Sequence, residues 1–247
     1  MAKQSGLGQR LLVGGYDISG DVQALNNVHG GPAALDVTDI TQSAHARIGG
    51  LRDGGLEAAV FFDAANAHPV LDALPTADVL ASYLLNVTLG GPAACCVAKQ
   101  IGYDPTRGAD GSLILKTQLD ANAYGLEWGV QLTPGLRTDT TATAASSSNS
   151  IDTAASLAFG AQAYLQVTAF SGTSVTCTVK DSADNSSFTA VTGLAFTAVT
   201  AAPAWQRLAT SNSATIRRYL AVATTGTFTS ASFSIVIVKN LLAGQVF

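Results

Sequence analysis

The residues able to perform chemistry are few and scattered along the 247-residue sequence. Its three histidines, His29, His45 and His68, form no His-x-His or His-x-x-x-His pair that could hold a metal ion on one face of an element. His45 and His68 could join Ser43 or Asp72 in a nucleophile–base arrangement, but the Gly-x-Ser-x-Gly motif of serine hydrolases is absent. We therefore expect no enzyme activity, no metal site and no cofactor.

Loops that bind phosphate or calcium are not indicated either. No Gly-x-x-x-x-Gly-Lys-[Ser/Thr] motif is present, and the glycine pairs do not precede helices, so they predict turns. Asp104 and Asp110, in the polar loop 103–111, lack the Asp-x-Asp-x-Asp spacing of a calcium loop. Cys95, Cys96 and Cys177 show no zinc spacing, and neighbouring cysteines rarely bridge, so all three are predicted to be small buried side chains.

Aromatic side chains leave one alternative open. Trp205, Tyr219, Phe228 and Phe233 could form a platform for a sugar ring. Residues of this kind more often fill the core of a small sandwich, and the core is the favoured interpretation.

Composition excludes several broad classes of protein. Hydrophobic residues make up 47% and charged residues 12% of the chain, which is the opposite of a disordered sequence. The net charge of −4 argues against electrostatic binding of nucleic acid. No apolar run reaches the roughly 18 residues of a bilayer-spanning helix, and the first residues lack the apolar stretch of a secretion signal. We expect a soluble globular protein made in the cytosol.

A change of composition divides the chain. Residues 138–150 are almost all small and polar, which predicts a flexible connection. We expect one domain over 1–140, a flexible linker over 141–155 and a second domain over 156–247. Up to residue 138 the chain has 8 Lys/Arg and 13 Asp/Glu, a net charge of −5, whereas the remainder has 5 and 4, a net charge of +1.

Short apolar runs between turn residues predict a mainly β protein. Strands are expected at 10–13, 56–62, 79–87, 93–101, 112–119, 126–132, 163–170, 174–179, 205–209, 219–223 and 233–238. Ser171-Gly172-Thr173 is predicted to be a hairpin turn. One or two short helices are expected, within 38–47 and 68–74. Strand spacing in the second domain predicts a small β-sandwich, jelly-roll or immunoglobulin-like.

Several motifs follow one another in the first 140 residues. They are Leu-Leu-Val-Gly-Gly-Tyr-Asp-Ile-Ser-Gly at 11–20, Leu-Asp-Val-Thr at 35–38, Arg-Ile-Gly-Gly-Leu-Arg-Asp-Gly at 47–54 and a strand ending in Phe-Phe-Asp at 61–63. With the loop 104–112 and the stretch 124–129, this order resembles the tail tube (major tail) proteins of long-tailed bacteriophages, including actinobacteriophages. The segments 164–167, 180–184 and 217–220 are similar to small β-sandwich modules appended to phage tail proteins.

The resemblance implies a structural role. Tail tube proteins form hexameric rings in which sheets of neighbouring subunits close an inner barrel, and stacked rings form the channel for genome delivery. The first domain would then be a tail-tube β-sandwich or barrel, and the second would project outward. The implied partners are other copies of the chain, other phage tail proteins and passing DNA that is not bound specifically, without a membrane. The implied location is the virion tail, assembled in the host cytoplasm.

Two groups of site residues follow from this resemblance. An acidic lumen would not retain DNA, since basic groups bind phosphates. We expect several acidic residues of the first domain to face the channel or the contact between rings. The main candidates are Asp17, Asp21, Glu57 and Asp63, and the further candidates are Asp36, Asp39, Asp72 and Asp78. The glycine-rich region 35–53 is expected to be a loop that orders when rings stack. Its candidate residues are Leu35, Asp36, Val37, Thr38, Arg47, Gly49, Gly50, Leu51, Arg52 and Asp53.

The alternative is a binding or decoration protein of the phage tail or capsid. In that case the C-terminal sandwich would contact the host surface or sugars.

Overall fold

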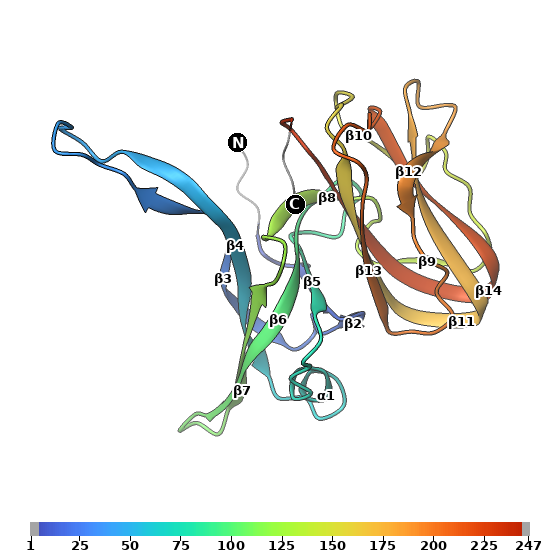
Figure 1. Cartoon of the computed structure of the whole chain (residues 1–247). Helices are drawn as coiled ribbons and strands as arrows, with labels where there is room; N and C mark the ends of the chain where they lie inside the picture. Colours follow the sequence, from blue (N-terminus) through green and yellow to red (C-terminus); the bar gives the residue numbers. More distant parts are fainter. Residues whose placement is uncertain (1–4, 244–247) are drawn as a thin grey trace. The chain divides into compact units, whose positions relative to one another are not determined.

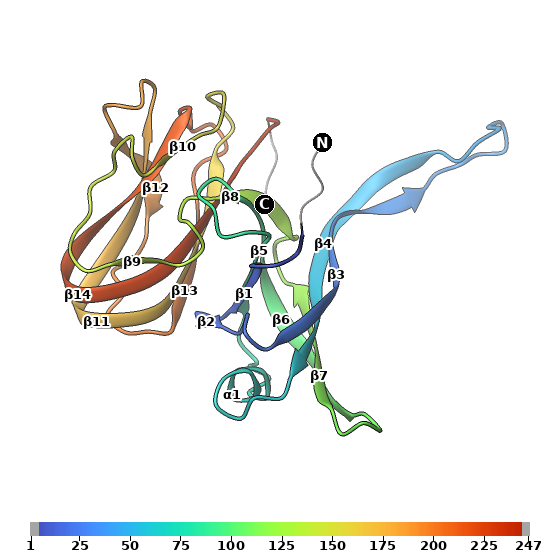
Figure 2. The same ribbon diagram turned by 180° about the vertical axis from the view of Figure 1, so that it is seen from behind.

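The computed structural model describes residues 5–243, and they form almost only β-strands (Figures 1 and 2). The mainly β prediction is therefore confirmed. The strands are β1 (Arg10–Val13), β2 (Tyr16–Asp17), β3 (Val22–Asp36), β4 (Arg47–Phe61), β5 (Val79–Leu84), β6 (Pro92–Arg107), β7 (Leu113–Ala121), β8 (Glu127–Gln131), β9 (Arg137–Asp139), β10 (Ser150–Asp152), β11 (Ala161–Ser182), β12 (Thr189–Ala195), β13 (Ala204–Ala209) and β14 (Tyr219–Lys239). The described part of the chain has one helix, α1 (Ala67–Leu71).

Contacts along the chain define two compact units. The first, called the β11–β14 unit after its longest strands, contains Met1–Gly20, Val79–Cys95 and Trp128–Phe247. The second, called the hairpin unit, contains Asp21–Asp78 and Cys96–Glu127. This division differs from the sequence-based boundary at residue 140. Strands β1 and β5 belong to the same unit as β11, and buried Gln166 on β11 shows why. Its Nε2 donates hydrogen bonds to Leu12 O on β1 and Leu80 O on β5, both at 3.1 Å.

The β11–β14 unit is built on one long antiparallel ladder. Its register runs from Ala161 opposite Lys239 to Ser182 opposite Tyr219. Val175, Cys177 and Val179 are buried, as their alternation predicts. They belong to a large apolar core that also contains the fully buried side chains of Leu165 and Phe233. Phe228 and Phe233 are buried while Trp205 and Tyr219 are half-buried, so the two phenylalanines belong to the core.

The predicted turn at Ser171-Gly172-Thr173 is wrong, because β11 continues through it. Gly172 lies opposite Phe228 of β14, and the pairing shifts register on either side of this glycine. Such a bulge absorbs an extra residue without ending the ladder. The strands predicted at 163–170 and 174–179 are therefore one strand, and those predicted at 219–223 and 233–238 are also one.

Residues 141–155, expected to be a flexible linker, are attached to β14. Thr143 and Thr224 exchange backbone hydrogen bonds of 3.1 and 2.9 Å. Further along, β10 pairs with β14 and places Ile151 opposite Leu220. Small polar residues satisfy their backbone groups on a neighbouring strand here, which composition alone does not reveal.

The hairpin unit is an antiparallel sheet in the order β3-β4-β7-β6. Val60 lies opposite Leu115, and Leu56 lies opposite Leu119, so one face of the sheet is apolar and buried. The helix α1 contributes buried Leu71 to this unit, and the Leu71 carbonyl accepts a hydrogen bond of 2.5 Å from Gln100 Nε2. The helix expected within 68–74 is therefore present, starting one residue earlier.

The second expected helix, within 38–47, is wrong. Residues 37–46 form the loop between β3 and β4. Asp36 Oδ1 accepts the Thr38 N–H at 2.9 Å, and Asp39 Oδ1 accepts the Thr41 N–H at 2.8 Å. Aspartate side chains that cap turns two residues ahead compete with helical hydrogen bonding, so the capping residues belong to turns here.

Candidate assembly surface

The longest projection of the hairpin unit is the outer part of the β3–β4 hairpin. β4 pairs with β7 only from Gly55 to Phe61, whereas its pairing with β3 continues outward to Arg47 opposite Asp36. Residues 31–53 are thus a two-stranded ribbon that continues past β7 (Figure 1). We call this segment the ribbon.

The base of the ribbon is held by a close backbone approach. A Cβ atom at Gly54 would lie 2.5 Å from Leu126 Cβ, and one at Gly30 would lie 3.0 Å from the same atom. Because only glycine leaves this space free, the two strands pack directly on Leu126. The ribbon therefore begins from a fixed point of the sheet.

The ribbon exposes several large apolar side chains. Leu51 is 88% exposed and Ile40 in the tip loop is fully exposed, while Leu35 lies opposite Ile48 and both are about half exposed. A two-stranded hairpin is only marginally stable in water by itself. Contiguous exposed apolar side chains on free strand edges favour pairing with another chain. The ribbon therefore has the properties of an association surface.

The tip loop is ordered by short polar contacts. Besides the Thr38 N–H, Asp36 accepts the Thr38 hydroxyl at 2.5 Å and contacts His45 Nδ1 at 3.0 Å through its other oxygen. Two hydrogen bonds from Thr38 lower the pKa of Asp36, and the one from the hydroxyl has a larger effect than the one from the backbone N–H. Hydrogen bonds from Thr41 lower the pKa of Asp39 in the same way. Both carboxylates are therefore negative at neutral pH.

All ten residues proposed for the contact between rings lie on this hairpin. Leu35, Asp36, Val37 and Thr38 come from the end of β3 and the start of the loop, and Arg47, Gly49, Gly50, Leu51, Arg52 and Asp53 come from β4. Strand pairing brings the two groups together. The ten predicted residues did not include Ile40 and Ile48. The one feature of the sequence that could have indicated them is that each is an isoleucine among polar and glycine residues.

The four acidic residues proposed for a lumen lie in separate settings. Asp17 belongs to the β11–β14 unit and forms an ion pair with Arg10 on β1. In the hairpin unit, Asp21 accepts a hydrogen bond of 2.8 Å from Asn66 Nδ2, and Asp63 accepts the Ala65 N–H at 2.7 Å before α1. Only Glu57 has a side chain on a broad sheet surface.

That surface is the polar face of the hairpin unit. Glu57 of β4 lies opposite Gln118 of β7, and Lys116 of β7 lies opposite Asp104 of β6. Further along, Asp120 lies opposite Lys99, whose ammonium group forms an ion pair of 2.7 Å with Asp78. These residues alternate with the buried apolar positions, so the face presents lysines beside carboxylates.

The histidines lie in three different places. His45 is in the tip loop, and His29 is an exposed residue of β3. His68 Nδ1 contacts the Tyr103 hydroxyl, and its Nε2 lies 3.5 Å from an oxygen of Asp72. Burial raises the pKa of Tyr103, and the negative charge of Asp72 raises it further by a smaller amount. This cluster links α1 to β6, and within residues 5–243 neither a serine nor a cysteine is among its hydrogen-bond partners.

Within residues 5–243, no group of three or more histidine, cysteine, aspartate or glutamate side chains is placed to hold a metal ion. No helix in the same part of the chain is long and apolar enough to cross a membrane.

Comparison with known proteins gives likeness in structure only. No protein family model matches the sequence, and no curated protein matches it either. Among solved structures, the chain is similar to the Dit protein (gp 19.1) of phage SPP1, described as a hub adsorption apparatus, with 11% identity and a TM-score of 0.36 over 94% of this chain and 99% of that one.

Two structures of the phage p2 baseplate in its activated conformation are also similar. The one solved with Sr has 10% identity and a TM-score of 0.33, covering 94% of this chain and 98% of that one. The one solved with Ca also has 10% identity and a TM-score of 0.33, covering 95% and 99%. Likenesses of this size do not define a function.

Proposed function

We propose that this protein is a non-enzymatic structural subunit of a phage tail, which self-assembles into rings. The observation that supports this most directly is the ribbon, which has exposed apolar side chains on a two-stranded hairpin with a free outer edge. The resemblance of the first 140 residues to tail tube proteins agrees with it. A ribbon of this kind is stabilised when a second copy covers it.

The order of strands in the hairpin unit suits a ring. The strands alternate in direction through β3, β4, β7 and β6, and β3 and β6 are its outermost strands. The relevant part of β6 is the one that pairs with β7, from Ala98 to Arg107. When β3 of one copy lies beside this part of β6 of the next copy, the two strands run antiparallel under rotational symmetry. An even number of alternating strands in each copy allows this junction to repeat around a closed ring.

We further propose that six copies form one ring and that rings stack into a tail tube. In this arrangement the polar face with Glu57 and Lys116 lines the channel, and the ribbon reaches the neighbouring ring. A face of mixed charge would let DNA pass without retaining it, because strong binding to phosphates needs clustered cations. The β11–β14 unit would lie on the outside.

Electron microscopy of the purified full-length protein tests this proposal. Long tubes are expected if rings form and stack. Isolated rings would contradict the tube and support a single ring, such as a hub. Monomers at every concentration would contradict self-assembly and favour the alternative role, a binding or decoration protein.

A shortened hairpin separates stacking from folding. Pro32 lies opposite Arg52, so residues 33–51 can be replaced by Asn-Gly, which favours a two-residue hairpin turn. This variant is expected to retain its thermal unfolding transition and to form no tubes. Normal tubes from the shortened variant would show that the ribbon is not the stacking contact.

A further inference from the structure

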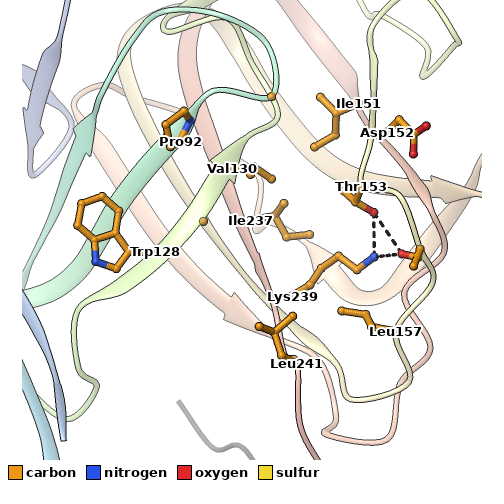
Figure 3. Close-up of a pocket in the computed structure, with 13 residues that line it drawn as sticks. Pro92, Trp128, Val130, Ile151, Asp152, Thr153, Leu157, Ile237, Lys239 and Leu241 are labelled. Carbon is orange, nitrogen blue, oxygen red and sulfur yellow. Dashed lines mark hydrogen bonds between the residues drawn. The ribbon is translucent and has the colours of Figure 1, made fainter. Parts of the chain in front are cut away.

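The β11–β14 unit contains a pocket that the proposed structural role does not use. It has a volume of about 540 Å³, which is within the size range of small-molecule sites. Figure 3 shows its walls, in which Trp128 and Val130 come from β8 and Ile237 and Lys239 come from β14. The rest of the lining is Ile151 and Asp152 of β10, with Gly90, Pro92, Gly129, Thr153, Ala155, Leu157 and Leu241.

The register of β8 and β14 places Trp128 and Lys239 on the same face of the ladder. Val130 lies opposite Ile237 in the β8–β14 ladder. Two residues further along each strand are Trp128 and Lys239, which the antiparallel register places on the same face as that pair. Trp128 is 50% exposed, so a flat aromatic ring remains open to solvent beside the pocket.

The Lys239 ammonium group is held without a carboxylate. It donates hydrogen bonds of 2.9 Å to Thr153 Oγ1 and 2.6 Å to the Ala155 carbonyl (Figure 3). These use two of its three N–H groups. Among the ion pairs of the described residues, none includes Lys239. Burial lowers the pKa of Lys239, and the negative charge of Asp181 only partly offsets this effect.

The other charges of the pocket are already neutralised. Asp152 receives two hydrogen bonds from Arg218, at 2.7 and 2.6 Å, and a third from the Ala154 N–H at 2.8 Å. The Arg218 contacts, followed by the Ala154 N–H, lower the pKa of Asp152 to about 2. One positive charge therefore remains in excess, that of Lys239. Asp152 keeps lone pairs that can still accept hydrogen bonds from hydroxyl groups.

We propose that this pocket binds an acidic saccharide, a sugar ring that carries a carboxylate or a phosphate. The apolar C–H face of the ring would lie on the Trp128 indole, the acid group would pair with Lys239, and hydroxyl groups would donate to Asp152. An apolar peptide side chain would leave Asp152 and the spare Lys239 donor unused. This ligand combines the aromatic surface, the donor and the acceptor found in one pocket.

Fluorescence of Trp128 gives a direct test. The chain has two tryptophans, so Trp205→Phe makes Trp128 the sole emitter. This variant is titrated with glucuronate, glucose 6-phosphate, glucose, acetate, inorganic phosphate and N-acetyl-L-leucine. Glucuronate or glucose 6-phosphate is expected to shift the emission with a dissociation constant at least tenfold below that of glucose. The tighter of the two acids identifies the acid group of the ligand.

Variants at Lys239 connect this preference to the pocket. Lys239→Gln is expected to remove the tenfold preference for the acidic sugar, whereas Lys239→Arg should keep it. Lys180→Gln, on β11 outside the pocket, is the matched control and should bind as the parent does. Calorimetry with Trp128→Ala should show at least a tenfold loss of affinity.

Four results would overturn the proposal. The first is that neither glucuronate nor glucose 6-phosphate binds more tightly than glucose, and the second is that acetate or inorganic phosphate binds as tightly as the sugar acids. The third is an unchanged preference in Lys239→Gln, and the fourth is that N-acetyl-L-leucine binds most tightly. The last result would identify a peptide site. None of them bears on ring formation, which microscopy tests separately.

Discussion

The side-chain oxygen of Gln166 accepts a hydrogen bond of 2.6 Å from the backbone N–H of Gly15, across 151 residues of sequence. The amide nitrogen of the same side chain donates to Leu12 O, Leu80 O and Ser82 Oγ. Gln166 is 1% exposed, so every one of these bonds is shielded from water. One buried amide on β11 thereby joins the β1–β2 turn, β1 and β5 in a single unit.

Replacing Gln166 with leucine is expected to lower the free energy of unfolding by about 1–3 kcal/mol, because the Gly15 N–H would be left buried without an acceptor. Urea unfolding followed by circular dichroism measures the loss. Gln206→Leu is the control, since Gln206 exchanges two hydrogen bonds of 2.8 Å with Thr197 at an exposed site. An equal loss in both variants would contradict this role of Gln166.

The turn next to this amide offers a second test. Gly14 and Gly15 connect Val13 with Tyr16 and have φ values of +60° and +88°. A Cβ at Gly14 would make only an ordinary contact of 4.0 Å with Val79 Cγ1, whereas a Cβ at Gly15 would lie 2.6 Å from the Ala204 nitrogen. Gly14→Ala is expected to cost about 1 kcal/mol from backbone strain, and Gly15→Ala about 3 kcal/mol or more. Thermal unfolding compares them, and similar losses would show that the backbone near Ala204 moves away easily.

Apolar alternation predicted many of the strands. β1 was expected at its observed residues, and β13 was expected within one residue of them. The long continuation of β14 was not predictable, because residues 224–230 contain threonine, serine and glycine and resemble a turn. The turn does not form because β11 supplies a pairing partner along this whole stretch. β3 was missed for a related reason: its side chains are mostly exposed, so no apolar period marks it.

The association surface was predictable in position but not in form. The sequence grouped Leu35 with Leu51, and pairing of β3 with β4 puts both on one ribbon. That these residues form strands was not predictable, since glycines and prolines usually indicate loops. The pocket was not predicted at all. Glu127-Trp128-Gly129-Val130 has the pattern of an ordinary strand, and the exposure of Trp128 depends on which side of the β8–β14 ladder is covered.

Stability is expected to fall in acid through the Asp152–Arg218 pair. Hydrogen bonds from Arg218 lower the pKa of Asp152 from 3.8 to about 2. A carboxyl with a depressed pKa in the folded state stabilises the protein fully above its unfolded pKa and loses that contribution as the pH falls towards the folded value. The melting temperature of wild type should therefore exceed that of Asp152→Asn above pH 5. The difference should shrink between pH 4 and pH 2, and it should be small because the pair is exposed. A constant difference over this range would contradict the assignment.

The cysteines are expected to be inert in the folded protein. Cys95, Cys96 and Cys177 are buried, as their predicted role requires. Burial and, to a smaller extent, the negative charge of Asp120 raise the pKa of Cys96 to about 12. Burial likewise raises the pKa of Cys177 to about 12. At pH 8 Ellman's reagent should modify them only after urea is added, since thiols react as thiolates. Ser148→Cys, at an exposed position, is the control and should react at once. Rapid labelling of wild type would show that the strands open locally.

Charge on the ribbon is expected to abolish self-association without unfolding the protein. Leu51→Lys places an ammonium group on a side chain that is 88% exposed in the single chain. It therefore costs little stability in the monomer, but it would bury an unpaired charge in an interface between copies. Sedimentation velocity should show Leu51→Lys as a monomer under conditions where wild type assembles, with the same melting temperature. Leu7→Lys is the matched control, because Leu7 is also 88% exposed but lies in the β11–β14 unit. Loss of assembly in both variants would point to a general effect of charge, whereas assembly of Leu51→Lys would show that other residues of the ribbon, or another surface, form the contact.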